Sequence, residues 1–357
     1  MDSSRLFALT KQDTNALKGI AIIAMLCHHL FAFPPEWANL PDSPFLLWLG
    51  SVGKVCVAIF LFCSGYGLSV QCSEKQPDGA KGMARFLVRR IGKFYANYWV
   101  IFLLFVPVTV VLFNRPLSAA YGESANVPFH LVLDWFGLQG VHSYNVTWWF
   151  NLLILLYYLF FPVVYYGCRK NVWITLVLAL VCCVVGGKCE WLYGQLFFDY
   201  ILPFTMGVAW SFCQNVPDRI ALFLSRNKYL FVILCVIALA VTVFFRQHKI
   251  LPCGFYSVKM DGFITCSLAL LISALRPFFS PTGVLSLFGK HSANIYLMHT
   301  FFNAYWPTSI WIHQYLSGLG KFVVLFSGCF LISLVLEWMK NRTKYNFLVL
   351  SILNKVR

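Results

Sequence analysis

Three ionisable residues stand at the two ends of one otherwise apolar segment near the start of the chain. Lys18 precedes the run IAIIAML, and His28 and His29 follow it. At about 100° per residue, Lys18 and His29 share one helix face about 16 Å apart, whereas His28 points about 80° away. That face combines a cation, which suits a phosphate, with an imidazole, which titrates near neutral pH and suits a general base.

Each of these residues also has a plainer interpretation. Lys18 could be a lysine that marks the membrane edge by extending its amine to the headgroups. His29 could be bonded within a helix bundle or lie at the headgroup boundary. Ionisable groups inside membrane spans are costly and usually functional, so the pattern favours a functional His29.

The amino-acid composition indicates that these segments lie in a membrane and not in water. Of 357 residues, 59% are hydrophobic and 11% are charged, against about 25% charged in soluble domains. Apolar runs recur at a length that can cross a bilayer. We therefore predict an all-α, polytopic membrane bundle of about ten transmembrane helices. The spans are expected at residues 17–33, 45–70, 94–113, 149–166, 172–186, 196–212, 229–245, 262–275, 295–312 and 322–338.

Charge placement predicts the orientation of this bundle. With the N-terminus in the cytoplasm, most of the 28 Lys and Arg residues fall on inside segments, as the positive-inside rule requires. Both termini are then cytoplasmic, and residues 1–357 form a single domain of the cytoplasmic (inner) membrane. Residues 339–357 are expected to form a cytoplasmic amphipathic tail. The net charge of +15 reflects topology and anionic lipids, and nucleic-acid binding is not expected.

Two loops on the expected outer side deserve separate predictions. Residues 114–147 are too broken to span and too aromatic for a linker, so they should form a cap at the outer interface. Residues 246–260 place three basic residues outside, which is either scatter or a basic lip for an anionic acceptor. The 13 cysteines include no CxxC pair, so neither a disulfide framework nor a metal site is predicted.

Five stretches, in this order, resemble the acyltransferase-3 family of integral membrane acyltransferases. The first is the Lys18 and His29 spacing itself. The others are FLFCSGYGL (60–68), RRIGKFYANYW (89–99), TWWFNLLILLYYLFFP (147–162) and LFGKHSANIYLMHTFF (287–302). The resemblance covers nearly the whole chain. It departs from the family pattern at Lys93, where arginine is usual, at Ala96, where proline is common, and at Ile154, where some members carry glutamate.

The resemblance implies transfer of an acyl group, usually acetyl from acetyl-CoA, to a glycan hydroxyl. His29 would be the general base. His299 would orient His29, bind the thioester carbonyl or pack in the core. Lys18, Arg90 and Lys93 would meet the phosphates of coenzyme A. The remaining residues assigned to the donor or substrate site, each with a packing role as the alternative, are His28, Ser64, Tyr66 and Trp149.

The expected partners are acyl-CoA, a glycan or lipid-linked sugar acceptor and membrane lipids. Polysaccharide-synthesis proteins or a second copy of the chain would fit as well, and no bound cofactor is predicted. The main alternative is a carrier or flippase for a lipid-linked sugar, and a non-catalytic scaffold is a further one. A carrier needs a polar path through several helices. Intramembrane ionisable residues are few: His29, Lys54, Asp199, Asp261 and His299.

Overall fold

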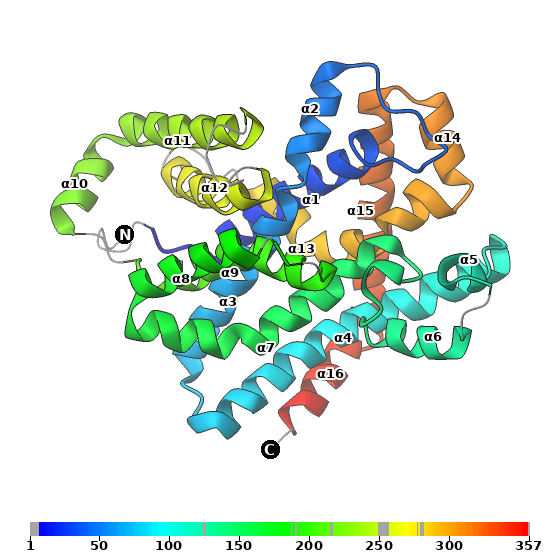
Figure 1. Ribbon diagram of the computed structural model, residues 1–357, viewed down its shortest axis with the longest axis horizontal. Helices are drawn as coiled ribbons and strands as arrows, with labels where there is room; N and C mark the ends of the chain where they lie inside the picture. The colour runs from blue at the N-terminus through cyan, green and yellow to red at the C-terminus, as the bar shows by residue number, and fades with distance from the viewer. Residues whose placement is uncertain are drawn as a thin grey trace. The chain divides into compact units, whose positions relative to one another are not determined.

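The computed structural model describes residues 7–123, 126–186, 188–189, 191–214, 217–248, 257–276, 278 and 282–355. All secondary structure in these ranges is helical, as predicted (Figure 1). The elements are α1 (Lys11–Phe31), α2 (Pro44–Gly53), α3 (Cys56–Lys75), α4 (Gly79–Leu112), α5 (Ser118–Tyr121), α6 (Val127–Trp135), η2 (Gly140–His142), η3 (Val146–Trp148), α7 (Trp149–Lys170), α8 (Val172–Gly186), α9 (Leu192–Phe212), α10 (Asp218–Arg226), α11 (Lys228–His248), η4 (Ser257–Met260), α12 (Asp261–Leu275), α13 (Thr282–Thr300), η5 (Phe301–Tyr305), α14 (Thr308–Tyr315), α15 (Gly318–Arg342) and α16 (Tyr345–Asn354).

Seven helices among the described residues are long and apolar enough to cross a bilayer. Composition and helix length therefore indicate a multi-pass membrane protein. The count of ten spans and the side of the membrane on which each terminus lies stay predictions. The second predicted span falls within one of these seven, the stretch Pro44–Lys75, which a short break interrupts. It is α2 followed by α3, with the exposed Lys54 at the break between them.

The chain forms two compact units, which we describe separately. The first comprises Met1–Ile22, Lys54–Gln76 and Phe160–Lys290. Its centre is the contact of α3 with α9, where the two helix backbones touch at glycines. A Cβ on Gly65 would collide with the Phe204 carbonyl, and one on Gly207 would collide with the Phe62 carbonyl. Larger residues at either position would separate the two helices.

Two ion pairs, one partly and one fully buried, join other elements of the first unit. The Arg276 guanidinium lies 2.6 Å from the Asp13 carboxylate at the start of α1. The Arg246 Nε lies 2.6 Å from Asp261 Oδ1, which ties the end of α11 to the start of α12. Arg246 was expected in an external loop, but it is only 5% exposed. Lys249, the second basic residue of the proposed lip, lies outside the described residues.

The second unit comprises Ile23–Gly53, Pro77–Leu159 and His291–Arg357. The segment that follows α4 returns alongside it, and α6 carries the contacts. Tyr95, Tyr98 and Trp99 donate to the backbone carbonyls of residues 136, 134 and 135, respectively. Tyr98 precedes Leu112, where α4 ends, by about 21 Å of helix. The segment predicted as a cap therefore reaches well along α4.

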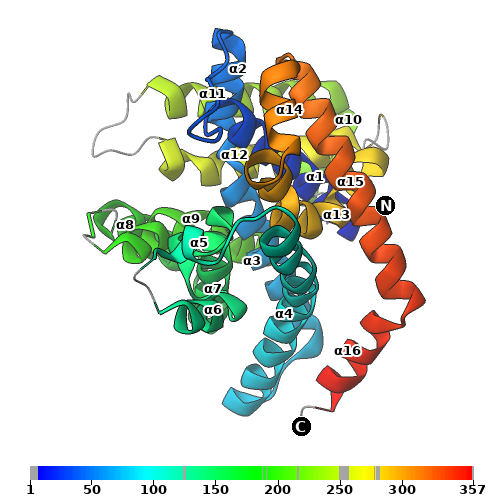
Figure 2. The ribbon, with the colours of Figure 1, turned by 90° about the vertical axis from the view of Figure 1, so that its right-hand side faces the viewer.

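The C-terminal helix of the second unit packs against α4, and both views show them side by side (Figures 1 and 2). The Tyr345 hydroxyl donates to the Ala96 carbonyl at 2.9 Å, and Arg89 Nε donates to the Leu353 carbonyl at 3.2 Å. The Leu353 side chain sits where a Cβ on Gly92 would lie. The predicted tail thus contains a helix, α16, that is docked on α4.

Candidate active site

The two adjacent histidines lie near the end of α1, within the second unit. Helix α2 approaches α1 very closely there. A Cβ on Gly50 would meet the backbone of Ala32, and one on Gly53 would meet the Ala24 carbonyl. Because both positions lack a side chain, the α1 backbone around the histidines is clamped against α2. This packing fixes the direction in which each imidazole leaves the helix.

His28 and His29 have different surroundings. His28 Nδ1 lies 2.9 Å from the Gly50 carbonyl, which can only accept, so this nitrogen carries the proton. The His28 ring also stacks on Phe33, with the ring centroids 6.2 Å apart. In contrast, no described residue makes a hydrogen bond to the His29 ring, and its side chain is only partly buried. Of the two, His29 has the nitrogens that a substrate could engage.

His29 and His299 come together, although they lie far apart in the sequence. Their ring centroids are 4.9 Å apart, while His28 and His29 are 5.3 Å apart edge to face. His299 is fully buried. Its Nδ1 donates to the Tyr296 carbonyl at 2.8 Å, and its Nε2 faces the Thr300 hydroxyl at 3.3 Å. The His299 ring is therefore held at both nitrogens beside a histidine whose ring is not.

A buried polar network extends from Thr300 into the segment before α7. The Thr300 hydroxyl lies 2.9 Å from that of Thr147, which donates to Asn145 Oδ1 at 2.8 Å. Asn145 Oδ1 also accepts the backbone N–H of Thr147 at 3.0 Å, as a capping side chain does at a helix start. All three side chains are 5% exposed or less. The network anchors the face of α13 that carries His299.

The Trp-rich start of α7 locks onto α13 at the turn before His299. Trp148 Nε1 and Asn145 Nδ2 both donate to the Leu297 carbonyl, at 2.9 and 3.3 Å. The Tyr296 hydroxyl donates to the Thr147 carbonyl at 2.7 Å. Directly after α13 the chain widens into the π-helical turn η5, a distortion that recurs at functional sites. Trp148 thus positions α13, whereas the ring of the predicted Trp149 packs edge to face against Phe150.

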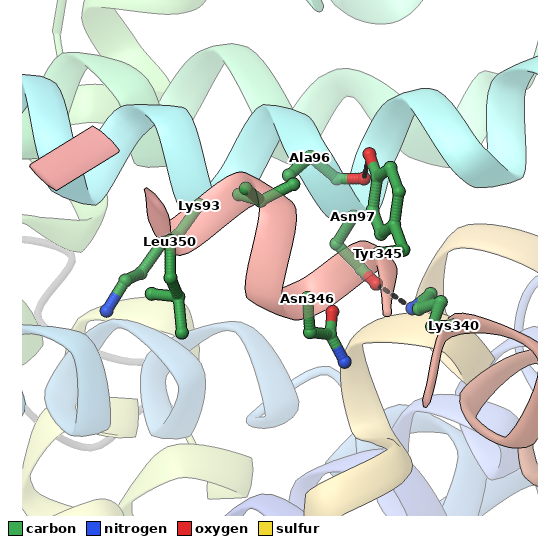
Figure 3. Close-up of a pocket in the computed structure, with 8 residues that line it drawn as sticks. Lys93, Ala96, Asn97, Lys340, Tyr345, Asn346 and Leu350 are labelled. Carbon is green, nitrogen blue, oxygen red and sulfur yellow. Dashed lines mark hydrogen bonds between the residues drawn. The ribbon is translucent and has the colours of Figure 1, made fainter. Parts of the chain in front are cut away.

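Lys93 lies at the edge of a pocket of about 270 Å³ between α4, α15 and α16 (Figure 3). We call it the Lys93 pocket. Lys340, which is 5% exposed, bonds Glu337 at 2.7 Å and Asn97 Oδ1 at 2.5 Å. Arg90 lies one turn earlier on α4, with its guanidinium 5.2 Å from the Tyr158 ring. Arg90 and Lys93 therefore share a basic region of the second unit. The pocket is lined by Lys93, Ala96, Asn97, Lys340, Tyr345, Asn346, Val349 and Leu350.

Three predicted site residues belong to the first unit. Lys18 lies half-buried in α1. The Tyr66 hydroxyl donates to the Leu9 carbonyl at 2.8 Å and accepts the Leu9 N–H at 3.1 Å, a structural role. Ser64 is half-buried in α3, one residue before the helix contact at Gly65. Within the described residues no group of three His, Cys, Asp or Glu side chains is arranged to hold a metal ion.

The chain thus combines apolar helices of membrane-spanning length with a contact between the partly buried His29 and the fully buried His299. The family model described as an acyltransferase domain, acyltransferase-3, matches residues 12–338. The chain therefore belongs to this acyltransferase family, and the resemblance is confirmed. No curated protein and no solved structure matches the chain. The family match ends before α16, so the wall that α16 gives to the Lys93 pocket lies outside the matched residues.

Proposed function

We propose that the protein is an O-acyltransferase of the cytoplasmic membrane that moves an acetyl group from acetyl-CoA to a hydroxyl of a cell-surface or exported polysaccharide. Membership of the acyltransferase family supports the reaction class. The contact of His29 with His299 is the main structural observation that supports this assignment of the active site. It supplies one imidazole with uncommitted nitrogens beside a second that is fixed by hydrogen bonds.

The proposed reaction needs one base and no covalent enzyme intermediate. His29 takes the proton of the acceptor hydroxyl while the oxygen attacks the thioester carbonyl. The resulting tetrahedral intermediate collapses, the C–S bond breaks, and the imidazolium returns its proton to the departing sulfur. The products are an O-acetyl ester and free coenzyme A, and His29 is neutral again. General-base assistance of this kind typically contributes about 10²- to 10⁴-fold in rate.

In this scheme His299 is a positioning residue. Its Nδ1–H is held by the Tyr296 carbonyl and its Nε2 faces Thr300, so its ring cannot rotate without losing both partners. The ring of His29 rests against it at 4.9 Å between centroids. A fixed neighbour of this kind limits the orientations of the base, and small misplacements of a catalytic group are costly in rate.

The donor is proposed to bind with its phosphates at Arg90 and Lys93. Guanidinium groups bind phosphate oxygens in pairs, and lysine acts as a point charge. In the Lys93 pocket Lys340 is already paired with Glu337 and bonded to Asn97, so Lys93 supplies the charge there and the amides of Asn97 and Asn346 add polar contacts. These groups suit the charged, polar nucleotide end of coenzyme A better than the acyl end.

The reaction is tested most directly by measuring the acetyl content of envelope glycans in a strain that lacks the gene and in the complemented strain. Loss of glycan acetate without the gene, and its return with the intact chain, is the expected result. Complementation with the His29→Ala chain should not restore it. Unchanged acetylation with an altered amount of exported glycan would contradict the enzyme proposal and favour the carrier.

The donor site gives a second prediction. Lys93→Ala and Arg90→Ala should each weaken acetyl-CoA binding by about tenfold, because a hydrogen bond to a charged group contributes about 1.5–3 kcal/mol. Folding should change little, since partly exposed charges add little stability. Equilibrium binding of labelled acetyl-CoA to the purified protein measures the effect. Lys81→Ala, an exposed lysine on the same helix, is the control, and equal affinity in all four proteins would remove both residues from the site.

A further inference from the structure

A second pocket, of about 600 Å³, opens in the second unit next to the end of α1. We call it the Trp37 pocket. Its volume falls within the range of about 300–1,000 Å³ that is usual for small-molecule sites. Its walls come from the end of α1, the segment between α1 and α2, α14 and the first turn of α15. Its lining residues include Leu30, Phe31, Trp37, Asp42, His313 and Lys321.

The Trp37 pocket lies beside the backbone of the residue that carries the proposed base, His29. Leu30 and Phe31 line it and follow His29 directly on α1, although their side chains leave the helix about 100° and 200° from that of His29, which does not itself line the pocket. The opposite wall reaches the same point through Asn303, which is 3% exposed. Asn303 Nδ2 donates to the His29 carbonyl at 3.4 Å, and its Oδ1 accepts from His313 Nε2 at 3.0 Å. The pocket wall and the backbone of the base are thus connected by two hydrogen bonds.

His313 carries an unused hydrogen-bonding position. Because the oxygen of Asn303 holds the Nε2–H, a neutral His313 has its lone pair on Nδ1. That atom is buried and has no hydrogen-bond partner among the described residues. Burial, with Lys321 nearby, lowers the pKa of His313 to about 4, so the ring is neutral at physiological pH. An unsatisfied buried acceptor is costly, and a small shift of the ring would turn this nitrogen toward the pocket that His313 lines, where a ligand hydroxyl would satisfy it.

The lining chemistry points to a sugar. Trp37 packs edge-on against His313, with ring centroids 5.5 Å apart, yet its side chain remains 49% exposed. It offers a flat apolar surface beside a carboxylate (Asp42), an amine (Lys321) and the amides of Asn39 and Gln314. An acyl chain would leave those polar groups without partners. A ring that presents hydroxyls at its edge and C–H groups on its face matches both kinds of surface.

The two pockets lie at opposite ends of one helix, α15. Gly318, at the start of α15, lines the Trp37 pocket, and Lys340, near its end, lines the Lys93 pocket. These residues are roughly 33 Å apart along the helix, which is close to the thickness of the hydrocarbon core of a bilayer. Helix α15 is also one of the seven candidate spans. A substrate in each pocket would therefore approach from opposite faces of the membrane.

We propose that the Trp37 pocket is the acceptor site, which receives the sugar that carries the reacting hydroxyl. Trp37 lies against the face of the sugar ring, and Asp42 and His313 bond its hydroxyls. The hydroxyl to be acylated then belongs to a part of the acceptor that extends from this pocket around the end of α1 to the His29 imidazole. This inference rests on the proposed function, because it names the acceptor site of the same reaction.

The test uses the full-length protein in lipid vesicles, saturating acetyl-CoA, and two acceptors: oligosaccharides released from the host envelope glycan, and lipid-linked sugars extracted from its membranes. Trp37→Ala and Asp42→Asn should each raise the acceptor KM by about tenfold and leave kcat within about threefold. Binding of acetyl-CoA should not change. The acceptor that shows this KM effect identifies whether the free or the lipid-linked sugar is the substrate.

Two matched variants serve as controls. Trp311, 50% exposed on α14, and Glu36, exposed beside Trp37, do not line the pocket, so Trp311→Ala and Glu36→Gln should retain the original KM. If the unmodified protein transfers acetate and the pocket variants keep its KM, the acceptor assignment is overturned. If the unmodified protein binds acetyl-CoA but acylates neither acceptor, the proposed function fails first and the assignment fails with it.

Discussion

Replacing His29 with alanine is expected to abolish measurable acyl transfer, while the protein still inserts into the membrane and still binds acetyl-CoA. Loss of the base should lower the rate by about 10²- to 10⁴-fold. Removal of its ring breaks no hydrogen bond within the described structure, so the fold should persist. Transfer to glycan and binding of labelled acetyl-CoA, measured on the same preparation, separate a lost base from a lost fold.

His28→Ala is the matched control for this experiment. The His28 side chain donates a hydrogen bond to the Gly50 carbonyl and stacks on Phe33. Loss of this hydrogen bond should lower the free energy of unfolding by about 0.5–1.5 kcal/mol. Transfer should stay within a few-fold of normal. An inactive His28→Ala protein together with an active His29→Ala protein would reverse the assignment and move the base to His28 or His299.

Helical spacing alone separated His28 from His29, but it could not supply the partner. The contact with His299 joins elements that are distant in the chain, and only the resemblance to the family suggested that His299 belonged to the site. The supporting network of Asn145, Thr147 and Thr300 was not predicted. A local signal existed, because an asparagine two residues before a threonine at the start of an apolar helix is typical of a capping turn.

In the fold, too, features of single segments could be predicted from the sequence, whereas contacts between distant segments could not. Composition and run length predicted an all-α membrane protein, since they depend on each segment by itself. They did not predict the break near Lys54 between α2 and α3, which an apolar run of spanning length conceals. They also did not predict that α6 returns along α4, because the hydrogen bonds from Tyr95, Tyr98 and Trp99 depend on tertiary packing.

Arg246 is the residue whose surroundings differ most from its predicted ones. A basic residue just after an apolar run is normally assigned to the loop, and Arg246 was therefore counted as an external charge. In the structure it is 5% exposed at the end of α11, and Asp261, at the start of α12, is fully buried beside it. The sequence separates these two residues by a segment that gives no indication of the pairing.

Removing either partner of this ion pair is expected to lower the free energy of unfolding strongly, which is the second large effect that we predict. Asp261→Asn would keep the shape of the side chain and leave the Arg246 charge buried without a counter-ion. Arg246→Met would do the reverse. Breaking a buried pair from one side typically costs about 3–5 kcal/mol, because an uncompensated charge remains. Each variant should therefore unfold at a markedly lower temperature than the original protein, followed in the same detergent by tryptophan fluorescence.

The double variant distinguishes the charge effect from a general packing effect. With both charges removed, no buried ion remains, and the protein should recover most of the stability that either single change loses. Lys228→Met removes an exposed charge from the other end of α11 and should change stability by less than about 1 kcal/mol. Single variants as stable as Lys228→Met, or a double variant whose losses simply add, would show that Arg246 and Asp261 do not depend on one another.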